Sequence, residues 1–128
     1  MAFNVWLLKI SKGRVGNKLG KQTILLLETT GRKSGKEHSI PIAYFEYDQQ
    51  FIIVASNWGR EQHANWYLNL KFNSQAKLGI RGVLNSVLAH EAEGEEYQKL
   101  WQFVTNRHPP YLSYQKMTSR KIPIMVFT

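Results

Sequence analysis

Six segments of the chain are short, rich in apolar and β-branched residues, and bounded by turn residues. They cover residues 23–30, 37–47, 51–55, 75–80, 83–91 and 122–127. Segments of this length and composition are typical of β-strands. Asp48-Gln49-Gln50 and Arg81-Gly82 are predicted to form tight turns between neighbouring segments, so most of the strands should pair as antiparallel hairpins. Pro123 fits an edge strand or a strand start, because proline cannot donate a ladder hydrogen bond.

Helices are predicted for residues 3–10, 64–72 and 93–107, where apolar residues recur three and four positions apart. The inner stripe of the longest helix is Tyr97, Leu100, Trp101 and Val104. Pro109-Pro110 ends that helix, and a short further helix is predicted for residues 111–118. The order of elements predicts an α+β fold, in which about six mostly antiparallel strands curl into a small barrel with helices packed outside.

At 128 residues the chain is long enough to bury a core, and we expect a single domain over residues 1–128. It contains no cysteine, which excludes disulfides, thiolate metal sites and cysteine nucleophiles. Its four histidines are far apart in sequence, so we expect no metal site. No apolar stretch is long enough to span a bilayer, and residues 1–10 lack the features of a signal peptide. These observations predict a cytoplasmic protein.

Positive charge is concentrated in the first third of the chain. The formal net charge is +8, and residues 1–36 hold eight of the 17 lysines and arginines but only one acidic residue, Glu28. A basic region of this kind suits nucleic acid, an anionic membrane surface or a phosphorylated ligand. For the part between Lys9 and Lys21, a solvated surface is an equally good interpretation.

A basic loop with a glycine at each end, Gly31-Arg32-Lys33-Ser34-Gly35, joins the first two predicted strands. Glycine permits backbone conformations that let a turn approach a ligand closely. Arg32, Lys33 and the Ser34 hydroxyl offer charge-assisted donors to a phosphate or carboxylate. His38 and Ser39, at the start of the next strand, would extend such an anion site. The alternative is an ordinary charged hairpin loop.

A second candidate is the segment Ser56-Asn57-Trp58-Gly59 together with the helix start Asn65-Trp66-Tyr67-Leu68-Asn69. A helix N-terminus presents free backbone amides that suit an anion or the polar edge of a ring. Trp58 lies in a predicted loop, where burial in the core is a weaker explanation for a large aromatic. Trp66 and Tyr67 fit a core position as well as a ligand contact.

A third candidate is His108-Pro109-Pro110-Tyr111 with Tyr114. Tyrosine hydroxyls can donate a proton or hydrogen bond to a substrate oxygen, although many buried tyrosines only satisfy a local backbone group. The sequence shows no defensible Ser-His-Asp order, no paired carboxylates near these motifs, and no Rossmann or P-loop glycine pattern. The basic loop and the aromatic segment together favour a cofactor with a phosphate tail and a ring head.

These residues, taken in order, resemble the deazaflavin-dependent nitroreductase family over about residues 23–127. The matching positions are Leu25-Leu26-Leu27, the run from Thr29 to Gly35, Pro41-Ile42, Val54-Ala55-Ser56, the run from Trp66 to Leu70, Pro110-Tyr111, Tyr114-Gln115 and Ile122-Pro123-Ile124. The resemblance implies a split β-barrel like that of reductases that bind flavin mononucleotide (FMN). It also implies that the cofactor is coenzyme F420, a deazaflavin with a phosphodiester and polyglutamate tail.

The resemblance further implies roles for individual residues. Arg32, Lys33 and Ser34 would meet the phosphate and the tail. The residues that would follow the deazaflavin, its ribityl chain or its phosphate are His38, Ser39, Ile40, Pro41, Ile42, Ala43, Val54, Ala55, Ser56 and Asn57. The residues that would contact the ring are Asn65, Trp66, Tyr67, Leu68 and Asn69. Tyr111 would close the substrate side as a catalytic residue, with Ser56 and Tyr114 as further catalytic candidates.

The leading hypothesis is an oxidoreductase that moves a hydride from reduced F420 to a small organic acceptor, namely a quinone, an activated alkene or a nitroaromatic. The first alternative is an FMN-binding reductase on the same barrel. The second is a basic module for nucleic acid or an anionic membrane surface, built on residues 9–36. These cations lack interleaved aromatic residues for base stacking, so we expect no nucleic-acid partner. Peripheral membrane contact and the oligomeric state stay open.

Overall fold

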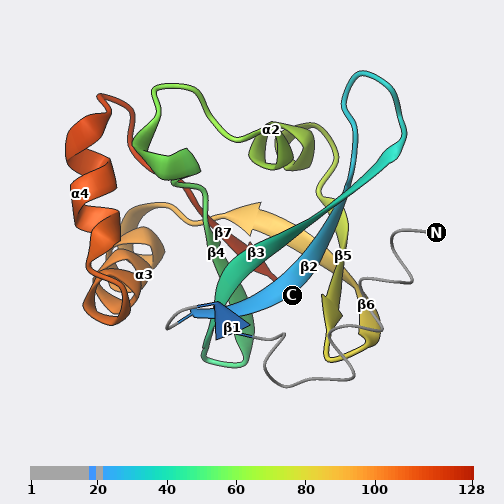
Figure 1. The fold of residues 1–128 in the computed structure, drawn as a ribbon, viewed down its shortest axis with the longest axis horizontal. Helices are drawn as coiled ribbons and strands as arrows, with labels where there is room; N and C mark the ends of the chain where they lie inside the picture. The colour runs from blue at the N-terminus through green and yellow to red at the C-terminus, as the bar shows by residue number, and fades with distance from the viewer. Residues whose placement is uncertain (1–17, 20–21) are drawn as a thin grey trace.

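A barrel of antiparallel strands forms the centre of the computed structural model, which describes residues 18–19 and 22–128 (Figure 1). Its strands are, in spatial order, β2 (Gln22–Thr30), β3 (Glu37–Tyr47), β4 (Gln50–Val54), β7 (Ile124–Phe127), β6 (Val83–Glu91) and β5 (Gln75–Ile80). Pairing of β5 with β2 closes the ring, and the short β1 (Lys18–Leu19) pairs with the start of β2. The predicted barrel is thus confirmed. The helix predicted for residues 3–10 lies outside the described residues.

Pro123 comes directly before β7, which pairs with β4 on one side and with β6 on the other. Of the two sequence interpretations, the strand start therefore holds and the edge strand does not. The residue is tolerated there because its carbonyl still accepts a hydrogen bond from the Ala55 amide, 2.9 Å away, whereas no ladder donor is needed from its nitrogen.

The barrel opens between β3 and β4. All of β3 from Glu37 to Tyr44 pairs with β2, but its pairing with β4 covers only Phe45 to Tyr47. Before Phe45, β3 therefore has a strand on one flank and no ladder with β4 on the other. Pro41 lies in this stretch, where a missing amide donor is tolerated. Over these residues, the flank of β3 that faces away from β2 is therefore not covered by β4.

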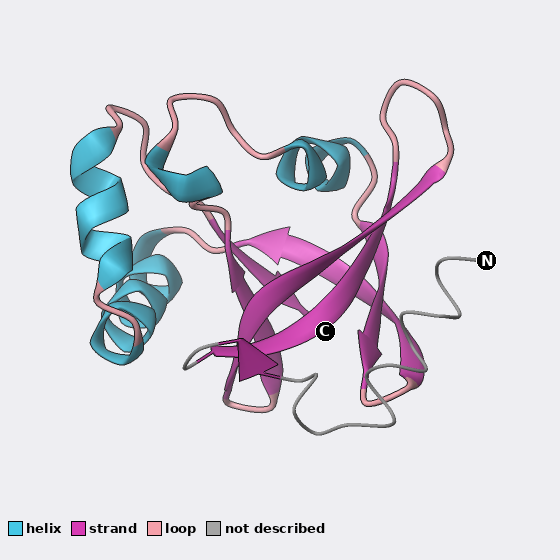
Figure 2. Cartoon of the chain, in the orientation of Figure 1, coloured by secondary structure: helices cyan, strands magenta, loops and turns pink. Residues whose placement is uncertain are grey.

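The helices lie outside the barrel, as predicted (Figure 2). A 3-10 turn, η2 (Asn57–Gly59), follows β4, and α2 (Asn65–Phe72) then crosses the space between this turn and the β2–β3 loop (Figure 1). The helices α3 (Gly94–Arg107) and α4 (Pro110–Met117) pack together on one side of the barrel. No helix in the described part of the chain is long and apolar enough to cross a membrane. The cytoplasmic location stays a prediction.

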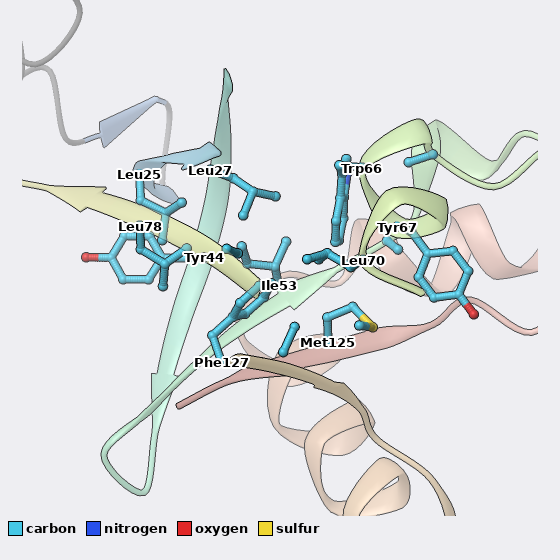
Figure 3. Close-up of a cluster of buried hydrophobic side chains, with 14 residues drawn as sticks. Leu25, Leu27, Tyr44, Ile53, Trp66, Tyr67, Leu70, Leu78, Met125 and Phe127 are labelled. Carbon is cyan, nitrogen blue, oxygen red and sulfur yellow. The ribbon is translucent and has the colours of Figure 1, made fainter. Parts of the chain in front are cut away.

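Alternate residues of β4 and β7 point to opposite faces of the barrel wall. They therefore belong to two different apolar clusters, one inside the barrel and one between the barrel and α3. Ile53, Met125 and Phe127 pack inside the barrel with Leu25, Leu27 and Leu78, and Trp66, Tyr67 and Leu70 of α2 cover one end of this cluster (Figure 3). The alternate residues Ile52, Val54, Ile124 and Val126 pack against Leu100 and Val104 of α3. Burial on both faces explains why these strands are almost wholly apolar in sequence.

Candidate cofactor-binding site

Three segments that are far apart in sequence meet around one pocket of about 740 Å³. The β2–β3 loop and the start of α2 border one end. His108, the first half of α4 and the 3-10 turn beside it border the other end. The wall between them is the open flank of β3, including residues 40–43. The pocket thus occupies the opening in the barrel.

Most of the site residues predicted from sequence line this pocket. They are Arg32, Lys33, Ser34, His38, Ile40, Pro41, Ile42, Ala43, Val54, Ser56, Asn57, Asn65, Trp66, Asn69, Tyr111 and Tyr114. Trp58 and His108, which stood out in the candidate motifs, line it as well. Residues of all three candidate motifs therefore line a single pocket.

Four residues of the predicted set lie outside the pocket. The Ser39 hydroxyl donates to Glu28 Oε2 at 3.4 Å. Its side chain therefore points to Glu28, whereas the neighbouring residues His38 and Ile40 line the pocket. Ala55 is buried in the barrel core, Leu68 packs against that core, and Tyr67 extends its hydroxyl to Glu91. None of these four side chains lines the cavity.

Three pocket residues were missed from sequence, namely Ile24, Thr29 and Ala64, whereas Gly31 belongs to the basic loop that the sequence singled out. Strand register contains the signal for two of them. Thr29 pairs with His38 and Ile24 pairs with Ala43 across the β2–β3 hairpin. Because paired residues in an antiparallel ladder lie on the same face, each could have been added from its predicted partner.

The basic end of the pocket is anchored to α2 through a buried amide. Asn69 Oδ1 accepts hydrogen bonds from the Arg32 backbone nitrogen at 3.2 Å and from Arg32 Nη1 at 2.8 Å. Asn69 is only 5% exposed, and its Nδ2 donates to Thr29 Oγ1. Asn69 therefore fixes both the backbone and the guanidinium of Arg32, whereas Lys33 is exposed to solvent. The loop that carries these two cations is therefore anchored to α2.

The tight fold of the loop depends on Gly31. A Cβ atom at this position would lie 2.6 Å from His38 Nε2 and 2.8 Å from Ser34 Oγ. Any side chain there would displace these two polar groups. Ser34 Oγ also accepts a hydrogen bond from the Lys36 amide at 3.2 Å. The close approach of the backbone therefore places Ser34 and His38 directly against Gly31.

The opposite end of the pocket is aromatic. The Tyr111 ring lies 4.9 Å from that of His108 and 6.2 Å from that of Tyr114, measured between centroids, and Trp58 lies 6.1 Å from Tyr114. Tyr111 is buried, but Trp58 is 67% exposed and stands at the rim. Burial lowers the pKa of His108, which favours the neutral imidazole at neutral pH. This end therefore suits a flat, uncharged molecule.

The complete chain, residues 1–128, matches the sequence family described as F420H(2)-dependent quinone reductase. The chain belongs to this family. A curated relative, the F420H(2)-dependent quinone reductase Rv1261c of Mycobacterium tuberculosis, is 34% identical over 122 residues, which are 92% of this chain and 82% of the relative. The family resemblance inferred from sequence is thereby confirmed, and coenzyme F420 is the cofactor that this family names.

Solved structures support the fold of this F420H(2)-dependent reductase. The F420-H2 dependent reductase FDR-A is 35% identical and superposes with a TM-score of 0.74, covering 82% of this chain and 93% of its own. A second structure, described as a domain-swapped dimer, is 30% identical with a TM-score of 0.78 and covers 99% of this chain and 96% of its own. The split barrel is therefore shared with a reductase of the same cofactor class.

The residues of the pocket fit coenzyme F420. Its anionic tail needs donors, and Arg32, Lys33 and Ser34 line the pocket at its basic end. Its flat ring needs an apolar slot with polar edges, which the flank from Ile40 to Ala43 and Trp66 provide. The pocket is large enough for a bulky ligand, since typical small-molecule sites measure about 300–1,000 Å³.

Outside the pocket, α2 is held to β6 by a polar cluster around Glu91. Its Oε1 accepts hydrogen bonds from the Tyr67 hydroxyl and from Lys71 Nζ, both at 2.8 Å. Burial alone would raise the pKa of Glu91, but the hydrogen bonds from Lys71 and Tyr67 outweigh it and lower the pKa. Burial and the hydrogen bond to Glu91 raise the pKa of the Tyr67 hydroxyl. The cluster therefore fixes the helix that carries Asn65, Trp66 and Asn69.

The lowered pKa of Glu91 makes stability depend on pH in a defined direction. Since the pKa is lower in the folded protein than the ordinary value of 4.5, the stabilisation is complete above that value and is lost as the pH falls through the folded-state pKa. The free energy of unfolding of the wild-type protein should fall between about pH 6 and pH 3. We expect a smaller fall for Glu91→Gln, measured by urea denaturation. Glu95→Gln, an exposed change on α3, should retain the wild-type slope; equal slopes in all three proteins would contradict the assignment.

Proposed function

We propose that this chain catalyses the reduction of a quinone by reduced coenzyme F420. The observation that carries the proposal is one continuous pocket with a cationic end and an aromatic end. The first end suits an anionic tail, and the second suits a flat acceptor that is stacked and hydrogen-bonded. The names of the family and of the curated relative support a quinone as the acceptor.

In this proposal the cationic loop binds the tail. Arg32 is held by Asn69 and Lys33 is free to follow a flexible chain of carboxylates. The ring would lie along β3 before Phe45, where the strand forms no ladder with β4 and residues 40–43 line the pocket. Trp66 and Val54 supply apolar surface to the ring. Binding at both ends would align the reacting atoms, which lowers the barrier through orientation.

When bound, the reduced cofactor supplies a hydride, that is, two electrons and one proton. Reduction of a quinone to a quinol also requires a second proton at a carbonyl oxygen. A phenol keeps its proton at neutral pH, so the hydroxyl of Tyr111 is suited to donate to the oxygen that gains charge. Ser56 and Tyr114 line the same end and can hydrogen-bond that oxygen. The buried Tyr111 ring also excludes water from this region.

Two measurements test the proposal. Calorimetric titration should show tighter binding of F420 than of FMN, because the extended anionic tail reaches the cationic loop. Steady-state assays with reduced F420 and menadione should show oxidation of the cofactor that depends on the quinone. Tighter binding of FMN, or cofactor oxidation that is the same with and without quinone, would reject the proposed function.

A further inference from the structure

Arg120 lies between α4 and β7 and does not line the pocket, yet its guanidinium contacts the chain segment that does. Nη2 donates to the Ser56 carbonyl at 2.8 Å, and Nε donates to the Arg60 carbonyl at 2.9 Å. Nη1 reaches the Ala55 carbonyl at 3.4 Å and lies 3.2 Å from His63 Nδ1. One planar group thus joins the two ends of the turn formed by residues 56–60.

The turn that Arg120 joins has an unfavourable backbone. Asn57 and Trp58 have φ angles of 47° and 60°, in the left-handed region that side chains disfavour, and Gly59 follows at 78°. A Cβ atom at Gly59 would lie 3.0 Å from the Tyr114 carbonyl oxygen and 3.1 Å from Met117, so the turn is also pressed against α4. Such a conformation persists only when surrounding contacts hold it.

A second contact joins the chain beside this turn to the C-terminal end of α4. The Glu61 carboxylate accepts hydrogen bonds from the Thr118 hydroxyl and from the Ser119 amide, at the C-terminal end of α4. These bonds, led by that from Thr118, lower the pKa of Glu61. Glu61 fixes the chain just after the turn, whereas Arg120 bonds the carbonyls of the turn itself. The shape of the turn therefore depends on Arg120 more directly than on Glu61.

We infer that Arg120 is a positioning residue, whose guanidinium holds residues 56–60 in the conformation that places Ser56, Asn57 and Trp58 on the pocket wall. Only the expected effect of Arg120 on catalysis rests on the proposed function. Arginine suits this role because its planar donors diverge and can reach several carbonyl oxygens at once. A lysine ammonium is a single compact group and cannot span the carbonyls of Ser56 and Arg60 with the same geometry.

The role is tested first without cofactor, by hydrogen exchange and mass spectrometry on the intact protein. We expect Arg120→Ala to increase exchange at least tenfold in peptides that cover residues 56–62, while peptides from β2 and β5 keep wild-type rates. Arg120→Lys should show the same local pattern to a smaller degree. If Arg120→Ala does not fold, Arg120→Lys alone decides. Unchanged exchange at 56–62, or an equal increase throughout the barrel, would overturn the inference.

Kinetics supply the second readout. We expect Arg120→Ala, or Arg120→Lys if the alanine variant does not fold, to lower kcat/KM for menadione at least tenfold. Millimolar guanidinium should partly restore the activity of the alanine variant. Lys116→Ala, which removes a nearby positive charge from the exposed side of α4, should keep the wild-type value. Wild-type kcat/KM in the tested Arg120 variant would overturn the role. A wild-type protein with no F420-dependent turnover would instead reject the proposed function, and hydrogen exchange would still decide the role of Arg120.

Discussion

Replacement of both Arg32 and Lys33 by alanine is expected to weaken F420 binding at least tenfold without unfolding the protein. A hydrogen bond to a charged group contributes about 1.5–3 kcal/mol, and about 1.4 kcal/mol corresponds to a factor of ten in affinity. Loss of even one such bond therefore reaches the expected change. The fold should tolerate the substitution because both side chains lie in a loop at the pocket rim, outside the two apolar clusters. Calorimetric titration with F420 measures the effect.

The matched control removes two positive charges elsewhere. Lys99→Ala with Lys116→Ala changes the net charge equally, on exposed positions of α3 and α4 outside the pocket. If long-range attraction by a basic protein were the cause, both double variants would lose affinity alike. Binding to the wild-type protein should also weaken with added salt, because exposed charges are screened. Unchanged affinity in the Arg32 and Lys33 double variant would remove the loop from the binding site.

The strands were predictable because their apolar runs are short and their turns are local. The closure of the barrel was only a general expectation, since it rests on the pairing of Leu26 to Thr29 with residues 76–79, which are about fifty positions away in sequence. The opening between β3 and β4 was not predictable at all. It depends on where the ladder between them stops, at Phe45. No residue type at this position indicates that the two strands diverge, although this divergence creates the pocket.

The sequence predicted the site as contiguous motifs, but only some residues of each motif line the pocket in the structure. On α2, Asn65, Trp66 and Asn69 line the pocket, whereas Tyr67 and Leu68 turn toward the core because successive helix residues point in different directions. Contiguous ranges taken from a family resemblance cannot make this distinction. Arg120 was missed for another reason. It bonds backbone carbonyls, which every residue has, so its partners leave no pattern in the sequence.

Tyr111→Phe should lower turnover with a quinone at least tenfold while F420 affinity stays within about threefold of wild type. General acid catalysis by a positioned side chain contributes about 10²–10⁴-fold, and the hydroxyls of Ser56 and Tyr114 at the same end can replace part of it. The phenylalanine ring preserves the packing of Tyr111 against Phe45 and His108. A loss in kcat and in kcat/KM by the same factor would show that the hydroxyl acts in the transition state.

Two tyrosine variants separate this role from a general effect of losing a hydroxyl. Tyr97→Phe removes a buried hydroxyl that donates to the Ile122 carbonyl at 2.6 Å, outside the pocket, so it should reduce stability but retain turnover. Tyr114→Phe removes a hydroxyl at the pocket rim and should have a smaller effect than Tyr111→Phe, because Tyr114 is more exposed than the buried Tyr111. Wild-type kcat in Tyr111→Phe would show that the ring only packs there. The proton for the quinone would then have to come from Ser56, Tyr114 or solvent.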